Sequence, residues 1–118
     1  MKKIYHLSTC NTNQRIIKEL GGLQGFEFQN IREQNIEPEV LDRLAQKLGS
    51  YESLFSRRAQ KFKSMGLKDK ILSEHEIRTL ILEEYTFLKR PVIVDGDYVF
   101  VGNAKSVVED AKLAIAKK

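Results

Sequence analysis

The sequence predicts an α/β fold: a four-stranded mixed sheet with a helical insertion. The prediction depends on three observations. A strand–helix–strand pattern opens the chain, several helix patterns fill its middle, and a strand hairpin followed by a helix ends it. A strand–helix–strand unit normally pairs its strands in parallel, whereas a hairpin pairs them antiparallel. A sheet that contains both is therefore mixed, and the helical middle is inserted between its two halves.

The opening unit begins with the apolar-centred run of residues 2–6, which suits a strand. A short run of turn and cap residues follows, and apolar side chains then fall at helical spacing until the pair Gly21-Gly22 stops the helix. Residues 26–31 begin with the alternation of apolar and polar side chains that is typical of a second strand. This order places Cys10 at the carboxyl end of the first strand and at the start of the first helix.

The middle of the chain carries four helix patterns. Pro38 suits the first turn of a helix over residues 39–48. Ser73 followed by Glu76 is a capping box, which opens a helix with apolar side chains at helical spacing. Two shorter helices are expected between them, over residues 51–55 and 58–65.

The end of the chain predicts a hairpin and a last helix. Asp95-Gly96 is a strong turn signal between the apolar runs 92–94 and 98–101. Asn103 suits the cap of a final helix, and the small and cationic residues at the end of the chain complement a helix C-terminus.

Composition narrows the class of protein. The chain has 118 residues, 42% of them apolar and 31% charged, so a single domain over residues 1–118 can bury a core. One cysteine rules out an intramolecular disulfide, and with only two histidines we expect no metal site. No signal peptide or membrane span is recognisable. Because a lone thiol is at home in a reducing compartment, we expect a cytoplasmic protein.

The charge balance indicates which partners are compatible. The net charge is +4 and the pI is about 9.2. A positive charge attracts phosphate or acidic partners weakly, but the basic residues are spread along the chain, which favours an ordinary lysine-rich solvated surface. We expect no membrane partner and no nucleic-acid partner.

Cys10 is the candidate catalytic residue. A thiol reacts as its thiolate, which helix N-terminal amides and nearby cations stabilise. The polar neighbours Asn11, Thr12 and Asn13 can hydrogen-bond a sulfur anion or an incoming oxyanion, and free amides at that position suit an anion. The alternative is a small buried core residue, which is a common role of a lone cysteine.

Three further features accompany the cysteine. Pro91 stands directly before an apolar strand, and proline is the residue for which a cis bond costs little, although a trans proline in a loop is the commoner arrangement. Arg58 and Arg90 are candidates to hold an anion, or else belong to solvated basic surface. His6 lies four residues before Cys10 and either pairs with the thiolate or is a hydrogen-bonded histidine on an edge strand.

Taken together, these motifs resemble the arsenate reductase (ArsC) and Spx family. The resemblance covers nearly the whole chain, in order and at the right spacing. It is carried by Ile4-Tyr5-His6 with Ser8-Thr9-Cys10, by Ser56-Arg57-Arg58 leading through Phe62 to Met65-Gly66-Leu67, by Leu72-Ser73-Glu74-His75-Glu76, and by Leu88-Lys89-Arg90-Pro91-Val92-Ile93-Val94-Asp95 with Val101-Gly102.

The resemblance implies a thioredoxin-like fold with a helical insertion and a cis Pro91 close to Cys10. In the reductases the cysteine attacks arsenate, arginines that match Arg58 and Arg90 hold the oxyanion, and glutathione with glutaredoxin resolves the adduct. The Spx branch instead binds the carboxy-terminal domain of the RNA polymerase α-subunit and senses redox state through a Cys-x-x-Cys pair.

The chain departs from both branches at the cysteine. The reductases continue Cys-Gly-Thr-Ser-Arg, whereas Gln14 stands here where that arginine is expected, and Asn103 lies where they carry a third arginine. Asn13 occupies the place of the second Spx cysteine.

These features favour a thiol oxidoreductase that acts on a small oxyanion or thiol substrate. It would bind no cofactor and would depend on an external thiol, either glutathione or a glutaredoxin or thioredoxin protein. The alternatives are a non-enzymatic regulator that binds the RNA polymerase α-subunit, and a family member whose cysteine chemistry is vestigial.

Overall fold

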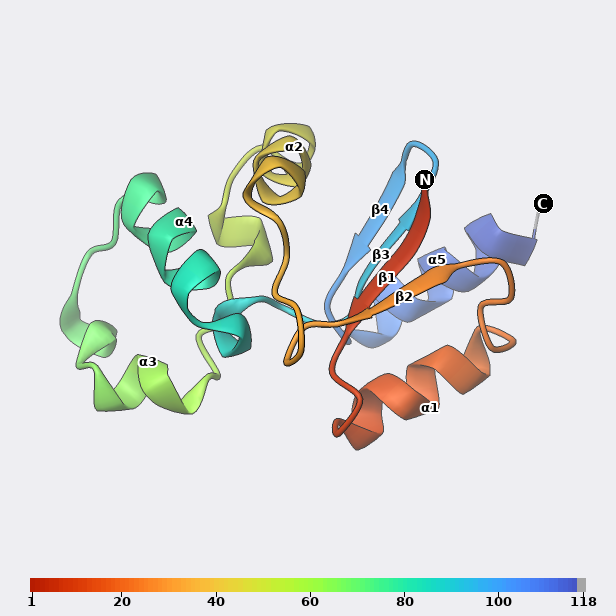
Figure 1. Cartoon of the computed structure of the whole chain (residues 1–118), viewed down its shortest axis with the longest axis horizontal. Coiled ribbons are helices and arrows are strands. Elements are labelled where there is room, and N and C mark those ends of the chain that lie inside the picture. Colours follow the sequence, from red (N-terminus) through yellow and green to blue (C-terminus); the bar gives the residue numbers. More distant parts are fainter. Residues whose placement is uncertain (117–118) are drawn as a thin grey trace. The chain divides into compact units, whose positions relative to one another are not determined.

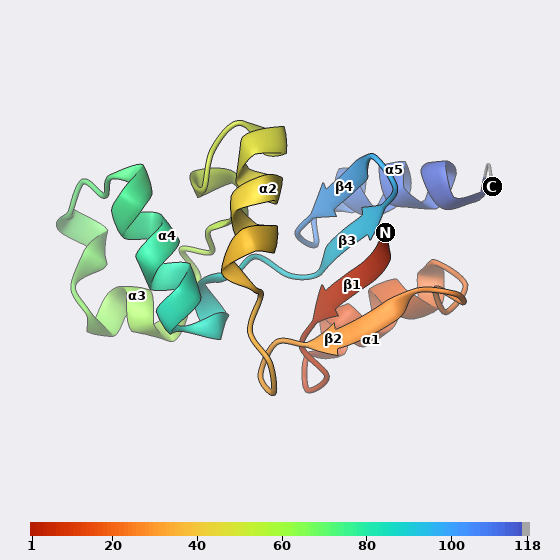
Figure 2. The ribbon, with the colours of Figure 1, turned by 45° about the horizontal axis from the view of Figure 1, so that its top comes forward.

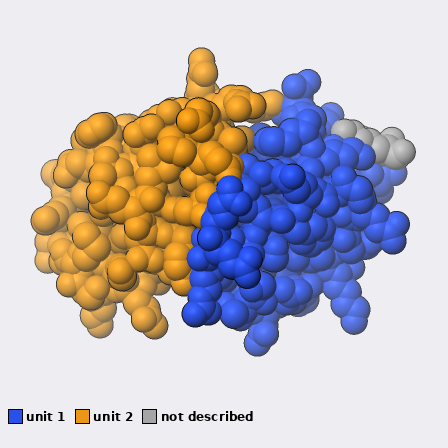
Figure 3. All heavy atoms as spheres, in the orientation of Figure 1, with its two compact units in different colours: residues 1–34, 90–118 blue, residues 35–89 orange. Residues whose placement is uncertain are grey.

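The computed structural model describes residues 1–116, which form two compact units (Figure 3). Unit 1 combines the two ends of the chain, residues 1–34 and the segment from Arg90 onward, and unit 2 comprises residues 35–89. Unit 2 is therefore inserted in the sequence between the two halves of unit 1, as the pattern of elements indicates. That both belong to a single domain over residues 1–118 stays a prediction.

Unit 1 contains the four-stranded mixed sheet (Figures 1 and 2). Its strands are β1 (Lys2–His6), β2 (Glu27–Asn30), β3 (Val92–Asp95) and β4 (Tyr98–Val101), and their order is β2-β1-β3-β4. β1 pairs in parallel with β2 and antiparallel with β3, which pairs antiparallel with β4. The predicted α/β fold with a mixed sheet is confirmed.

Two helices, α1 (Asn11–Glu19) and α5 (Lys105–Ala116), pack on the same face of this sheet (Figures 1 and 2). Strand and helix side chains meet there in one cluster, and fully burying one aliphatic side chain stabilises a fold by about 1.5–3 kcal/mol. The buried members of the cluster are Ile4, Ile16, Leu20, Leu23, Ile93, Val108 and Ala111. This cluster fixes the position of α1, and with it the position of the cysteine.

The glycine pair ends α1 as the sequence predicts. Gly21 has a φ of +76°, a left-handed conformation that glycine adopts without steric cost. Its amide donates to the carbonyl of Lys18 (3.0 Å) and the Gly22 amide donates to that of Ile17 (2.9 Å). These two bonds satisfy carbonyls that the last turn of a helix leaves without partners.

The C-terminal hairpin is confirmed, with a turn one residue later than expected. Asp95 pairs with Tyr98, so Gly96 and Asp97 form the two-residue turn, and Gly96 takes a φ of +61°. The prediction that Asn103 caps the last helix is wrong, because α5 begins only at Lys105. The prediction of a helix end at the chain's last two residues, 117–118, lies outside the described residues.

Unit 2 consists of helices and short turns. Its α-helices are α2 (Pro38–Leu48), α3 (Gln60–Ser64) and α4 (Glu74–Glu83), and its 3-10 turns are η1 (Glu52–Leu54), η2 (Leu67–Asp69) and η3 (Tyr85–Phe87). The rings of Phe55 and Phe87, both buried, stack with centroids 5.4 Å apart. Within residues 1–116, no helix is both long and apolar enough to cross a membrane.

The capping box of α4 is confirmed, whereas the two short helices are shorter than predicted. The Glu76 amide donates to Ser73 Oγ (3.1 Å), and the Ser73 amide donates to the Glu76 carboxylate (3.0 Å). The pattern over residues 51–55 forms only the 3-10 turn η1, and α3 starts after Arg58 rather than at it.

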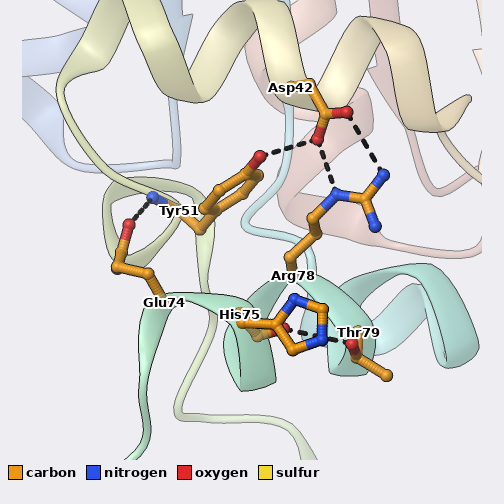
Figure 4. Close-up of polar contacts among 6 residues, drawn as sticks. All are labelled: Asp42, Tyr51, Glu74, His75, Arg78 and Thr79. Atoms are coloured by element: carbon orange, nitrogen blue, oxygen red, sulfur yellow. Dashed lines mark hydrogen bonds and ion pairs between the residues drawn. The ribbon is translucent and has the colours of Figure 1, made fainter.

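A polar network joins α2 to α4 within unit 2 (Figure 4). The Asp42 carboxylate accepts from Arg78 through Nε (2.7 Å) and a terminal nitrogen (3.2 Å), and from the Tyr51 hydroxyl (2.7 Å). These hydrogen bonds hold the pKa of Asp42 below its ordinary value, because the ionised carboxylate is the better acceptor. Ionised Asp42 therefore stabilises unit 2.

Replacing Asp42 with asparagine is expected to lower the melting temperature at pH 7. Because the pKa of Asp42 is lowered in the folded chain, its stabilisation is present above the ordinary value of 3.8 and is lost as the pH falls through the lowered value. The difference between wild type and Asp42→Asn should therefore shrink in acid. Thermal melts between pH 7 and pH 2 measure it, and Asp69→Asn on the exposed turn η2 is the matched control. An equal difference at every pH would contradict the ion-pair explanation.

Candidate active site

Cys10 is the residue that caps the N-terminus of α1, as predicted. Its backbone is extended, with φ −91° and ψ 114°, and its half-buried thiol is free. Its carbonyl accepts the first helical bond, from the Gln14 amide at 3.1 Å. The amides of the first turn have no partner within the helix, and this turn contains no acidic residue. Cys10 therefore lies beside free backbone amides, in a turn without a carboxylate.

The sheet register brings the Arg90–Pro91 segment to the same edge as the cysteine. Tyr5 pairs with Val92, so β1 ends where β3 begins. At this edge the chain passes from β1 to Cys10, and it enters β3 from Arg90 and Pro91. The Arg90–Pro91 bond is cis, which the family resemblance implies. Arg90 itself is half-buried.

Residues 7–10 form a turn that ends at Cys10 and is held by side-chain amides from two elements. We call it the cysteine turn. Its own hydrogen bond runs from the Cys10 amide to the Leu7 carbonyl (3.0 Å). Asn30, at the end of β2, donates to Ser8 Oγ (2.8 Å) and accepts from the Ser8 amide (3.4 Å). Gln14, on α1, donates to the Ser8 carbonyl (3.0 Å).

Asn13 points into the protein. Its side chain is only 1% exposed, and its Oδ1 accepts from the Leu7 amide at 2.9 Å. Its Nδ2 is buried and has no hydrogen-bond partner among residues 1–116. Leaving a buried donor unsatisfied costs about 1–3 kcal/mol. Asn13 therefore anchors the start of the cysteine turn through its side chain, and its predicted contact with an oxyanion would come from its backbone amide.

His6 is buried, and burial lowers its pKa by disfavouring the charged ring, while Glu33 partly opposes this. The ring is therefore mainly neutral at pH 7 and brings little positive charge to the site. It packs against Phe28 with the two rings nearly perpendicular and their centroids 5.5 Å apart. The interpretation of His6 as an edge-strand histidine is wrong, because β1 lies between β2 and β3.

The other residues predicted to belong to the site lie in different parts of the structure. Asn11 and Thr12 occupy the first turn of α1, directly after Cys10. Arg58 is exposed and belongs to unit 2, where it precedes α3. Its role toward an oxyanion stays a prediction, as does that of Arg90. In residues 1–116, no three histidine, cysteine, aspartate or glutamate side chains gather as metal ligands do.

Three residues around the cysteine are not predicted as site residues by the sequence. The sequence indicates Gln14 only as a departure from the family pattern, and Ser8 only as part of a motif. Asn30 bonds Ser8 from 22 positions away. A polar residue at the end of the strand that pairs in parallel with β1 is the one signal that could have indicated it, because parallel strands end at the same edge.

Comparisons with known proteins give one family. The ArsC family model matches residues 5–111. Solved structures of similar fold include an arsenate reductase from Vibrio cholerae (21% identity, TM-score 0.76, covering 97% of this chain and 96% of that one) and an arsenate reductase (ArsC) related protein from Brucella melitensis (22%, TM-score 0.70, 92% of each). A third, from Bacteroides fragilis, is described as ArsC family related (22%, TM-score 0.79, 93% and 96%).

These structures share the thioredoxin-like fold that the resemblance implies. None of the curated proteins compared with the chain matches it. The family model spans most of the sequence, including Cys10 and the segment from Arg90 into β3. The chain belongs to the ArsC family.

Proposed function

We propose that the protein is a thiol oxidoreductase of the arsenate reductase type, with Cys10 as its single nucleophile. The observation that carries the proposal is the position of Cys10 as the N-terminal cap of α1, in a first turn without acidic side chains. A helix N-terminus favours the thiolate, which is the reactive form. Membership of the ArsC family supports this class of reaction.

In the proposed reaction Cys10 Sγ attacks the arsenic atom of dihydrogen arsenate. One arsenate oxygen leaves as water, and a sulfur–arsenic bond replaces it. An external thiol then attacks Sγ, so the sulfur–arsenic bond breaks and its electron pair reduces arsenic(V) to arsenic(III). Arsenite leaves, and Cys10 remains in a mixed disulfide. Because the chain has one cysteine, a second external thiol must release it.

The oxyanion would be held by charged and neutral donors. Arg58 and Arg90 are proposed to bind it, since arginine matches the geometry of tetrahedral oxyanions. The backbone amides of Asn11, Thr12 and Asn13 add donors at the helix N-terminus. Glutathione, or a glutaredoxin or thioredoxin protein, is the proposed reductant, which places the reaction in a reducing cytoplasm.

One observation favours the alternative, a regulator that binds the RNA polymerase α-subunit. Where the reductases have an arginine, Gln14 brings no charge and its amide is bonded to Ser8. A pull-down with the carboxy-terminal domain of the α-subunit discriminates the two functions. Retention of that domain by a chain without reductase activity would favour the regulator.

The decisive experiment is the pH dependence of Cys10 alkylation by iodoacetamide, with and without arsenate. We expect faster alkylation at pH 7 in the folded chain than in urea, because the helix N-terminus acts only in the folded chain. Arsenate should slow alkylation, because it would occupy the site. Identical rates in folded and unfolded chains, with no effect of arsenate, would contradict the proposal.

A further inference from the structure

We propose that Gln14 and Asn30 are positioning residues, which hold the cysteine turn so that the Cys10 thiol stays at the N-terminus of α1. The inference rests on the proposed thiol chemistry and assigns it two residues outside the set predicted from the sequence. Neither residue needs to touch a substrate. Both act through Ser8, two positions before the cysteine.

The two amides engage every polar group of Ser8. Asn30 binds its hydroxyl (2.8 Å) and its amide (3.4 Å), and Gln14 binds its carbonyl (3.0 Å). Asn30 comes from the end of β2 and Gln14 from the first turns of α1, so Ser8 is fixed against both the sheet and the helix. A functional side chain is held in place when the residues around it are fixed by hydrogen bonds to rigid helices and strands.

Without these bonds the turn has little to hold it. Ser8 and Thr9 are exposed, so burial of their side chains contributes little to ordering them. The backbone hydrogen bond within the cysteine turn joins Cys10 to Leu7. Asn13 anchors Leu7, and Asn30 and Gln14 hold Ser8 in the middle of the turn.

The position of this turn matters because the effect of a helix terminus is short-ranged. Stabilisation of an anion falls off within the first turn of a helix, so the sulfur must stay close to the free amides. The direction of the Cys10 side chain follows from the backbone that enters it, and Ser8 and Thr9 supply that backbone. A loosened turn would let the thiol sample positions away from the amides, and its thiolate would be less favoured.

The experiment compares Gln14→Met, Asn30→Ala and the double variant with wild type. Methionine keeps the length of glutamine but donates no hydrogen bond. We expect iodoacetamide to alkylate each single variant about two- to fivefold more slowly at pH 7, the loss expected when a helix-terminus interaction is weakened. The pH–rate profile should move to higher pH, which a merely structural role would not produce.

The double variant tests whether both residues act through the same turn. Once the hydrogen bonds from one residue are lost and Ser8 is mobile, losing those from the other should slow alkylation less. The rate effects of the two substitutions should therefore not multiply. Gln24→Met, at an exposed glutamine of the α1–β2 loop, is the matched control and should leave the rate unchanged. In urea all variants should react alike.

The outcomes separate this inference from the proposed function. If wild type reacts faster than its urea-unfolded form while both single variants keep its profile, the positioning role is wrong and the thiol chemistry stands. If folded wild type reacts no faster than unfolded chain, the proposed function fails first. Thermal melts confirm that each variant is folded. Fully multiplicative effects in the double variant would contradict the inference that both residues act through the same turn.

Discussion

Replacing Cys10 with serine is expected to abolish arsenate reduction. A serine hydroxyl is a far poorer nucleophile at neutral pH than a thiol that forms its thiolate. No other cysteine in the chain can take over its role. Removing the nucleophile of an enzyme typically lowers turnover by about 10³-fold or more, so the residual rate should match a blank without protein. The assay couples arsenate reduction to glutathione with a glutaredoxin.

The same variant should keep its fold. Serine is close to cysteine in size, and the side chain is only half-buried, so we expect a stability change of about 1 kcal/mol or less. Circular dichroism and a thermal melt check this. Wild-type turnover by a folded Cys10→Ser chain would end the catalytic interpretation and favour the binding function.

Replacing Asn13 with cysteine is expected to create an intramolecular disulfide. Residues 10 and 13 lie three positions apart at the start of α1, where helix geometry places Cα atoms about 5 Å apart. That separation is within the range that a disulfide spans. Under mild oxidation the variant should lose both thiols to alkylation and regain them with dithiothreitol. Mass spectrometry of the alkylated chain measures the change.

The matched control is Asn13→Ser. Both substitutions remove the Oδ1 that accepts from the Leu7 amide, a loss that the removal of the unpaired Nδ2 partly offsets, but only one adds a thiol. Equal loss of stability in the reduced variants, with a disulfide in Asn13→Cys alone, is the expected result. If Asn13→Cys stayed fully alkylated after oxidation, the short Cα separation would not bring the two thiols within bonding distance.

Much of the fold could be predicted because its signals are local. Apolar alternation, helical spacing and the aspartate-glycine turn each concern residues within one element, and the elements they indicate are present. The helix predicted over residues 51–55 is a 3-10 turn rather than an α-helix, and Leu54 and Phe55 are buried there. The sequence pattern does not distinguish the two.

The site was less accessible to prediction, because its contacts join distant residues. The helix pattern placed Cys10 at the start of α1. The Ser8–Asn30 bonds depend on the register of β1 with β2, in which His6 pairs with Asn30, and a sequence does not reveal register. The position of His6 was misjudged for the same reason, since only the strand order shows that β3 closes the second side of β1.

The insertion of unit 2 between β2 and β3 has a consequence for how the chain folds. The strand–helix–strand unit and the hairpin can each form from near neighbours, but β1 meets β3 only when Tyr5 reaches Val92. Such long-range closure slows folding more than it weakens the folded state, because each doubling of loop length costs only about 0.6 kcal/mol. The central pairing of the sheet is therefore expected to form late, and the sheet edge that carries both Cys10 and Arg90 is complete only after it.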